Sequence, residues 1–422
     1  MKHVVVIGGG IVGLTTAWSL LEAGFEVTLV EREPQLAQGA SRANGGQLSY
    51  RFVSPLADQG DPLKALGWLF DPDSPLRFKP EFSLHQWTWL LSFLMNCRAS
   101  VNRSTTQRML ALGAYSQASF AHIHANAQLA DVSLRTPGKL VIYRGAKEFA
   151  AVAARLRGNA SNTEKVLSYQ ECLAVEPALE HCPVQLAGGV FTEGEAVADC
   201  YALSLQLGER LKAHSHFKGI VHATAQSFEI QNGKAVALHT DKGAIAASDF
   251  VIAAGLQSRA LAMTAGIRLP IYPLKGYSLT APIAAHHKPP VVSVTDIEKK
   301  TLYARIGSEL RVAAMADLVG EDLRIDPKRI ASLHRSVRAT FPEAANFEGC
   351  EEWAGLRPAT PSCTPLLGAT PVSGLWLNAG HGALGFTMSF GAARIVSALI
   401  AGKESPLSLD GLQLKQSETR AL

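Results

Sequence analysis

The sequence predicts an α/β fold with two domains, one built around a parallel sheet and one an α+β domain with an antiparallel sheet. Two observations predict it. The order of apolar strand, glycine turn and helix occurs at the N-terminus and again near the C-terminus, so the first domain is expected to be assembled from distant segments. Between these units lie short runs in which apolar and polar residues alternate. This pattern is typical of antiparallel strands with one face packed on a core and the other exposed to solvent.

The composition is that of a globular protein. Of the 422 residues, 47% are hydrophobic and 18% are charged, and a chain of this length can bury two cores. The net charge is +4 without any basic block, which gives no indication of nucleic-acid binding. The six cysteines are scattered and form no CxxC pair. We therefore expect no metal site and no disulfide framework, and we expect a reducing, cytoplasmic location.

The N-terminal unit carries the strongest motif of the chain. Residues 4–7 are a continuous apolar run, too short for a signal peptide and typical of a parallel strand buried on both faces. Gly8, Gly10 and Gly13 follow in a GxGxxG pattern that opens a predicted helix. These glycines allow a tight turn, the approach of a pyrophosphate and close packing of helix on strand. A second apolar strand ends at Glu31, whose carboxylate can accept hydrogen bonds from an adenosine ribose.

This register of strand, glycines, helix, strand and acid predicts a Rossmann-like dinucleotide site. The acid also disfavours NADP, since it would repel the 2′-phosphate. A plain glycine-rich turn within an ordinary βαβ unit is the alternative. Because NAD and FAD share the motif, other segments must distinguish them.

Three further segments favour a flavin dinucleotide. A small, polar loop at residues 40–47 can wrap a pyrophosphate and a ribityl chain. An apolar strand at 250–255 ends in small residues, and a strand at 375–379 enters a glycine turn and a helix that reaches about Gly402. The N-terminus of that helix can stabilise the negative charge of a reduced flavin. The candidate cofactor contacts are Gly8, Gly10, Gly13, Glu31, Arg32, Ser41, Arg42, Gly45, Gly46, Gln47, Ala254, Gly255, Gly380, His381, Gly382, Leu384 and Gly385.

The chain is expected to alternate between the two domains. The nucleotide domain is assigned residues 1–75, 195–265 and 346–405, the second domain 76–194 and 266–345, and residues 406–422 are a polar tail. The second domain would cover the flavin face with its antiparallel sheet.

Four blocks together resemble one known group. They are the N-terminal segment through SRANGGQ at 41–47, YPLKGYSLT at 272–280, WAGLRP at 353–358, and residues 378–388. In these the chain is similar to the D-amino-acid dehydrogenases of the small-subunit type, within the glycine oxidase and D-amino-acid oxidase superfamily. The resemblance implies non-covalently held FAD, oxidation of a D-amino acid to an imino acid that hydrolyses to a keto acid, and a respiratory electron acceptor instead of oxygen. It also implies that Arg357 binds the substrate carboxylate.

One block departs from this group. The relatives usually have Asp-Gly-Thr-Pro where this chain has Ser-Cys-Thr-Pro at residues 362–365. That loop lies near substrate and flavin in the relatives, so which amino-acid side chain the enzyme prefers is left open. The candidate substrates include cyclic ones such as D-proline or hydroxy-D-proline.

The expected chemistry centres on Arg357. A guanidinium suits bidentate binding of a carboxylate, and Tyr277 or Tyr50 can add a hydroxyl donor. The clamp would hold the substrate α-carbon against flavin N5 for hydride transfer. His381 is a candidate base, although packing or hydrogen bonding beside the flavin ring is the more common role for such a histidine. Lys275 is expected to be structural.

The segment 85–97 contains Trp87 and Trp89 among apolar residues. Indoles favour the membrane interface, so a peripheral contact with the inner membrane would suit a dehydrogenase linked to a quinone or a carrier. Core packing of an amphipathic helix is favoured over that contact. No apolar stretch is long enough to predict a transmembrane helix, and the oligomeric state is not predicted.

Two alternatives remain for the function. One is an oxidase or dehydrogenase of secondary amines such as sarcosine. The other is a flavin-bearing subunit that relays electrons without a substrate site of its own, which the carboxylate-binding role of Arg357 argues against.

Overall fold

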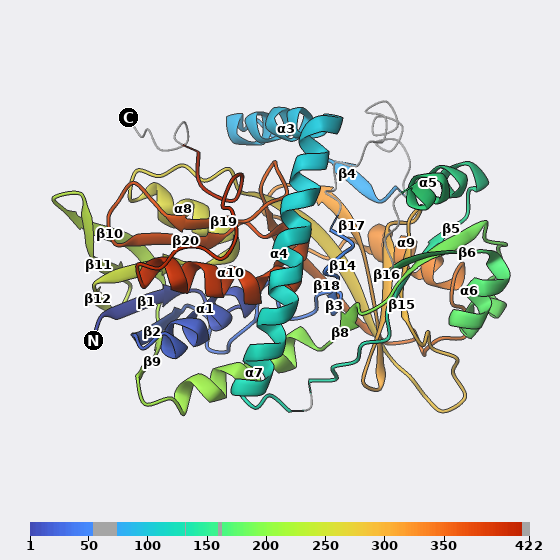
Figure 1. Ribbon diagram of the computed structural model, residues 1–422, viewed down its shortest axis with the longest axis horizontal. Coiled ribbons are helices and arrows are strands. Elements are labelled where there is room, and N and C mark those ends of the chain that lie inside the picture. The colour runs from blue at the N-terminus through green and yellow to red at the C-terminus, as the bar shows by residue number, and fades with distance from the viewer. Residues whose placement is uncertain (54–73, 131, 159–162, 416–422) are drawn as a thin grey trace.

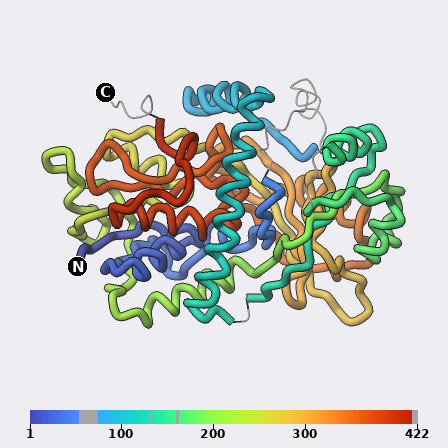
Figure 2. Tube along the Cα trace, in the orientation of Figure 1, coloured from blue at the N-terminus to red at the C-terminus, as the bar shows by residue number. Residues whose placement is uncertain are grey.

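The computed structural model describes residues 1–415 apart from 54–73, 131 and 159–162. The chain forms two neighbouring halves, each built on its own large sheet, and both ends of the sequence contribute to the same half (Figure 1). The tube in Figure 2 shows the blue N-terminal and red C-terminal segments side by side there. The fold class therefore agrees with the expectation, including a domain assembled from distant segments.

The first half contains a six-stranded sheet in the order β19-β20-β13-β1-β2-β9. Four of its five pairings are parallel, and only the edge strand β19 runs antiparallel to its neighbour. The central strands β1 and β13 are buried apart from His3 at the start of β1, which explains why they are largely apolar runs. The strands are β1 (His3–Ile7), β2 (Glu26–Glu31), β9 (Phe217–His222), β13 (Asp249–Ile252), β19 (Leu366–Ala369) and β20 (Leu375–Ala379).

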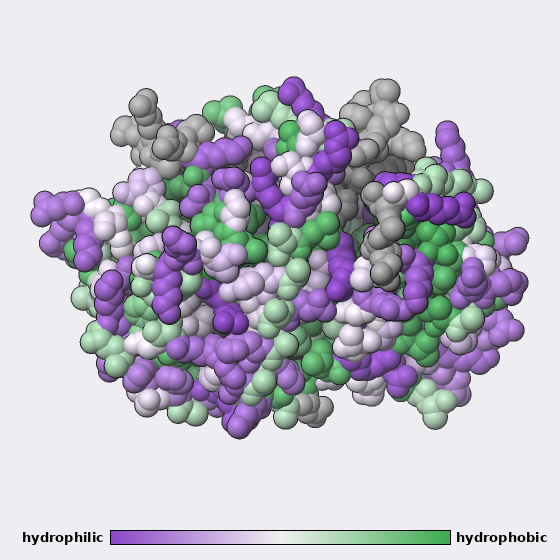
Figure 3. All heavy atoms as spheres, viewed as in Figure 1, coloured by the Kyte–Doolittle hydropathy of each residue, from purple (hydrophilic) through white to green (hydrophobic). Residues whose placement is uncertain are grey.

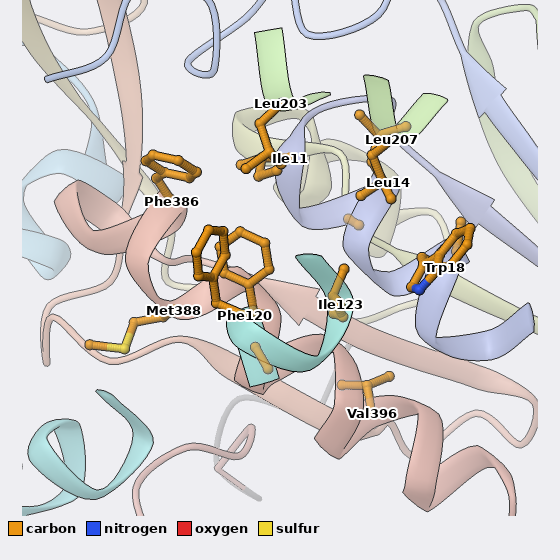
Figure 4. Packing of buried hydrophobic residues seen from close by; sticks show 14 of the residues in the cluster. Ile11, Leu14, Trp18, Phe120, Ile123, Leu203, Leu207, Phe386, Met388 and Val396 are labelled. Carbon is orange, nitrogen blue, oxygen red and sulfur yellow. The ribbon is translucent and has the colours of Figure 1, made fainter. Parts of the chain in front are cut away.

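Helices from four parts of the chain cover one face of this sheet. They are α1 (Ile11–Glu22), α4 (Ala99–Asn126), α7 (Cys200–Lys212) and α10 (Gly385–Ile400). Their apolar side chains pack in the largest core cluster, to which Leu14, Phe120 and Met388 belong (Figure 4). The helical segment Gly382–Ile400 is long and apolar enough to cross a membrane, but 67% of its most apolar 18-residue stretch is buried inside the protein. Its packing between α1 and α4 explains that composition.

The second half is built on a nine-stranded sheet in the order β18-β14-β17-β16-β15-β5-β7-β6, with β4 paired to β17. Most pairings are antiparallel, and α9 (Pro327–Arg338) covers one face. The strands are β4 (Leu76–Phe78), β5 (Lys139–Tyr143), β6 (Glu164–Leu167), β7 (Gly188–Thr192), β14 (Tyr272–Pro282), β15 (Ser293–Asp296), β16 (Thr301–Ile306), β17 (Glu309–Leu318) and β18 (Glu351–Ala359).

Smaller elements complete the fold. Two minor sheets are formed by β10 (Ala225–Gln231), β11 (Lys234–Thr240) and β12 (Gly243–Ala246), and by β3 (Gln47–Leu48) with β8 (Ala196–Val197). The other α-helices among the described residues are α3 (Leu84–Asn96), α5 (Ala146–Gly158), α6 (Tyr169–Val175) and α8 (Ser258–Met263). The same residues form the short 3-10 helices η1 (Pro177–His181), η2 (Gly255–Gln257) and η3 (Gly382–Leu384).

Two elements depart from the expected division of the chain. β18 was assigned to the nucleotide domain, but it pairs along its whole length with β14 in the large antiparallel sheet. α4 was assigned to the second domain, but its buried face packs on α10 in the core of the first half. Neither partner can be read from the local pattern of apolar residues. The other boundaries stay predictions.

Helix α3 lies across one end of α4 at the edge of the molecule (Figure 1). Core packing was favoured for its indoles, and this holds for Trp89, which is 3% exposed and donates a hydrogen bond to Ala359 O at 3.0 Å. It fails for Trp87, which is 48% exposed. Only Trp89 and Gln86 of this helix are buried.

Candidate active site

A cavity of about 2770 Å³ lies between the two halves. Its walls include the glycine turn after β1, the loop 37–49, the carboxyl ends of β13 and β20, and one face of the large sheet. In open α/β sheets, ligands bind outside the carboxyl ends of the strands. The position of the cavity therefore agrees with the predicted nucleotide site, and the large sheet closes it from the other side.

The glycine turn is shaped for close approach of backbone and ligand. Gly8 has φ +113°, and a Cβ there would lie 2.5 Å from Ala253 O. A Cβ on Gly13 would lie 1.8 Å from Gly8 O, so this glycine is required for packing and does not line the cavity. Gly10 is different, because a Cβ there would meet only Ser41 Oγ, at 3.3 Å. Its missing side chain leaves space inside the cavity, where a phosphate can reach the N-terminus of α1.

Polar groups at this end of the cavity suit a dinucleotide. Ser41 Oγ accepts a hydrogen bond from Ile11 N, the first residue of α1, at 3.1 Å. The N-cap residue of this helix is Gly10, which has no side chain to cap the helix. The Glu31 carboxylate accepts one from Gly9 N at 2.5 Å and one from Glu33 N at 2.9 Å. Each carboxylate oxygen has two lone pairs, so Glu31 can also accept a ribose hydroxyl.

The C-terminal unit supplies the opposite end. Gly380 has φ +74° and Gly382 φ +55°, and His381 between them is 5% exposed. The His381 Nε2 is buried and has no hydrogen-bond partner among the described residues. Burial lowers the pKa of His381 to about 4, so the imidazole is neutral at neutral pH. A buried ring nitrogen without a partner, in a residue of the cavity wall, suits a hydrogen bond to a polar edge of a bound flavin.

The loop 43–49 crosses the face of the large sheet and joins the two halves. Ser278 Oγ donates to Ala43 O at 2.8 Å, and Arg311 Nη1 donates to Asn44 O at 2.7 Å. The glycines behind it leave room for side chains of β16, because a Cβ on Gly45 would lie 2.7 Å from Leu302. Side chains of β14 and β17 thus hold the loop along the cavity wall, and β16 packs against it.

Arg357 lines the cavity from β18. Its Nη1 donates a hydrogen bond to Met315 O at 2.7 Å. Burial lowers the pKa of its guanidinium, and the charge of Asp317 partly offsets this. Asp317 itself is paired with Arg329, at 2.5 Å. Two residues after Arg357, the backbone of Ala359 pairs with that of His381, so β18 joins the Arg357 and His381 parts of the cavity wall.

Two of the predicted site residues, Tyr50 and Arg42, lie outside the cavity wall. Tyr277 is part of the wall, but its ring packs in the apolar cluster beneath α9, with the Lys275 ammonium 5.2 Å from the ring, and side-chain alternation puts the ring on the sheet face opposite Gly276. Tyr50 is buried in the helical core of the first half and does not line the cavity. The Arg42 side chain is exposed and lies 3.6 Å from Glu351. The remaining predicted cofactor contacts, except Gly13, all line the cavity.

The cavity wall also holds a buried cation, Lys139, that is not among the predicted site residues. Lys139 is 3% exposed, and its Nζ donates to Gln47 Oε1 and to Ser49 Oγ, each at 3.0 Å. Burial lowers the pKa of this ammonium, and the charge of buried Glu195 opposes the shift. The signal was present in the sequence, because a lysine opens the apolar strand β5.

Known proteins resemble this chain over almost its full length. It is 44% identical over 412 residues to a D-amino acid dehydrogenase 2 of Pseudomonas aeruginosa, covering 97% of this chain and 98% of the relative. It is 40% identical to a D-amino acid dehydrogenase of Paramagnetospirillum magneticum, covering 97% of each chain. In fold it resembles a glycine oxidase from Geobacillus kaustophilus, with a TM-score of 0.76 at 20% identity, covering 99% of each chain.

The family model that describes FAD dependent oxidoreductases matches residues 3–399. The glycine turn, the free space at Gly10 and the unpartnered His381 fit that cofactor independently of the match. The chain belongs to the family of FAD dependent oxidoreductases.

Proposed function

We propose that this flavoprotein is a dehydrogenase that oxidises a D-amino acid at its α-carbon to the imino acid. The observation that carries the proposal is Arg357, a guanidinium in the wall of a cofactor-sized cavity that forms none of the ion pairs found among the described residues. Its bond to Met315 O uses one of its five N–H groups, which leaves donors for both oxygens of a carboxylate. The preference for D-amino acids rests on what the two bacterial relatives are named for.

FAD, when bound, supplies the acceptor for a hydride. The residues of the chain position the substrate. A bidentate pair with Arg357 fixes the carboxylate and so the direction of the α-hydrogen. His381 is neutral and a weak base, which supports a role in hydrogen bonding at the flavin edge and not in proton abstraction. The substrate amine therefore enters neutral or loses its proton to water before the hydride leaves.

Dye-coupled turnover tests this function. Purified enzyme with an artificial electron acceptor should convert D-alanine, D-proline or another D-amino acid of a panel to its keto or imino acid, and leave the L-isomers unchanged. Oxygen uptake without the dye should be at most a small fraction of the dye-coupled rate. Equal oxygen uptake would identify an oxidase, and no turnover of any amino acid would favour a subunit that only relays electrons.

We further propose that the electron acceptor lies in a membrane and that α3 contacts the membrane. Helix α3 contains no Asp, Glu, Lys or Arg. Around it, large apolar side chains are exposed, and green spheres lie among purple ones over α3 at the top of Figure 3. These side chains are Phe82 (114% exposed), Leu84 (81%), Trp87 (48%), Leu91 (62%), Leu94 (48%) and Met95 (50%). Exposed Arg98 and Arg103 follow, which suits anionic headgroups.

The cavity reaches this helix, because Leu90, Phe93 and Leu94 also line it. Vesicles of phosphatidylglycerol and phosphatidylethanolamine should therefore sediment the protein. The double change Trp87→Glu and Leu91→Glu should abolish this binding without loss of dye-coupled turnover. A charge at Leu205, an exposed leucine of α7, is the matched control and should leave binding intact. Binding that survives the α3 changes would contradict the proposal.

A further inference from the structure

Two glycines of neighbouring strands leave the sheet backbone bare beneath two large side chains, Gly276 beneath Arg357 and Gly355 beneath Trp353. Gly276 of β14 is directly opposite Gly355 of β18 in the antiparallel register. A Cβ on Gly276 would lie 2.2 Å from Arg357 Nη2, 2.4 Å from Cζ and 2.5 Å from Nη1. A Cβ on Gly355 would lie 1.9 Å from the ring of Trp353. The guanidinium and the indole therefore lie against the backbone of the sheet.

The backbone conformation does not require glycine at position 276. Its φ is outside the left-handed region, so any residue can adopt it. The three atoms nearest to a Cβ at this position all belong to the Arg357 guanidinium. These are the far end of a flexible side chain, which can swing aside. A methyl group at this position would thus cost the fold little but would displace the guanidinium.

The second contact comes from a strained residue. Met315 has φ +72° within β17, although methionine rarely adopts this conformation. The ladder with β14 shifts register at this point, between Lys275 and Tyr277, as at a β-bulge. The bulged residue turns its carbonyl oxygen to accept the 2.7 Å bond from Arg357 Nη1. Strain of this kind persists where the surrounding structure imposes it, and it concentrates at functional sites.

We infer that Gly276 and Met315 are positioning residues that hold the Arg357 guanidinium flat and aimed at the substrate carboxylate before substrate binds. The inference rests on the proposed function of Arg357. Because Gly276 has no side chain, the guanidinium can lie flat on the sheet backbone. The hydrogen bond to Met315 O fixes the orientation of the guanidinium within that plane. A fixed guanidinium loses little conformational freedom when the carboxylate arrives, and this strengthens binding.

Binding of propionate, a carboxylate without an amine, tests the inference. Its Kd is measured by the change in flavin absorbance of the purified holoenzyme, together with KM for the best amino acid. Gly276→Ala should raise both Kd and KM by about tenfold or more, which is the loss expected for a misplaced charged hydrogen bond. Flavin content and thermal midpoint should stay near those of the wild type, because only a flexible side chain must move.

Two changes at Met315 separate backbone from side chain. Met315→Gly and Met315→Val both remove the thioether, but glycine accepts a positive φ and valine does not. The glycine variant should keep Kd within about threefold of the wild type, and the valine variant should raise it about tenfold. Thermal midpoints of both variants are recorded, and the valine variant is compared at a temperature where it is folded.

Arg357→Ala distinguishes the possible failures. If it leaves the propionate Kd and the KM unchanged, Arg357 does not bind the carboxylate and the proposed function loses its support. If Arg357→Ala raises both but Gly276→Ala does not, Arg357 binds the carboxylate without needing the bare backbone at Gly276, and the inference is wrong. Equal losses in the glycine and valine variants at position 315 would show that the thioether matters and not the bulge.

Discussion

The Nζ atom of Lys139 donates a hydrogen bond to Ser49 Oγ at 3.0 Å, at the point where the loop from the first half reaches the edge of the large sheet. The same loop is held from the other side by Glu195, whose carboxylate accepts from Tyr50 N at 2.7 Å and from Arg51 N at 2.8 Å. One buried cation and one buried anion thus fix three consecutive residues of this loop, Ser49 to Arg51, and the cation binds Gln47 as well.

Replacing Lys139 should therefore destabilise the protein. Lys139→Met keeps most of the apolar stem but removes two hydrogen bonds and takes one of two opposing charges away from buried Glu195, which keeps Arg51 at 4.0 Å. We expect a loss of about 3 kcal/mol in the free energy of unfolding. Urea unfolding at pH 8 measures this, and Lys165→Met, at an exposed pair with Glu193, is the control, with a change below about 1 kcal/mol. A loss as small as the control's would show that Lys139 does not hold the loop.

Replacing Gly10 and replacing Gly13 should impair different properties of the protein, FAD binding in the first case and folding in the second. Gly13→Ala places a Cβ 1.8 Å from Gly8 O, and backbone cannot yield, so the apoprotein itself should lose about 2 kcal/mol of stability. Gly10→Ala meets only Ser41 Oγ, at 3.3 Å, so the apoprotein should melt within a few degrees of the wild type. Its methyl group stands where the pyrophosphate approaches, and the Kd for FAD should rise about tenfold or more. Thermal unfolding of the apoproteins checks the two stabilities, and fluorescence titration with FAD checks the affinity; unchanged FAD affinity in Gly10→Ala would remove this turn from the cofactor site.

His381 should make stability fall at acidic pH. The pKa of His381 is about 4 in the folded protein, below the usual value, so between about pH 6.5 and pH 4 the unfolded chain binds more protons than the folded one. Stability contributed by neutral His381 is present above that window and is lost as the pH falls through it. From pH 7 to pH 5, the wild type should lose about 2 kcal/mol more than His381→Asn.

Urea unfolding at the two pH values measures this difference. The same variant tests the assignment of roles, since His381→Asn should retain measurable turnover if the imidazole is only a hydrogen-bonding partner. Loss of all turnover with FAD still bound would instead make His381 the catalytic base. If the stability of His381→Asn depended on pH in the same way as that of the wild type, the imidazole of His381 would not be held neutral by burial.

The nucleotide half was the more predictable part of the fold. Its strands are buried on both faces and its turns need glycine, so residues 4–13 and 375–385 carry local patterns that specify their structure. The antiparallel half was predicted only as alternating strands, because the partner of a strand depends on distant pairing. β18 shows this: its pattern does not reveal that it pairs with β14, about 80 residues earlier in the chain.

The candidate site was predictable to a similar extent. Residues whose role depends on the backbone, such as Gly10 and Gly382, could be named from the motif alone. Roles that depend on which face of a strand is buried could not, and Tyr277 was assigned to the substrate although its ring packs beneath α9. Gly276 and Met315 act only through Arg357, which is adjacent in space but distant in sequence.

Anaerobic reduction of the bound flavin by amino acids is the direct test of the proposed dehydrogenase activity. The purified holoenzyme is mixed, without oxygen or dye, with matched D- and L-isomers of a panel that includes alanine, proline and hydroxyproline. One or more D-isomers should bleach the flavin absorbance band and their L-isomers should not, and Arg357→Ala should require far higher substrate concentrations for the same bleaching. Flavin that stays oxidised with every D-isomer, or that is bleached only by L-isomers, would contradict the proposed activity.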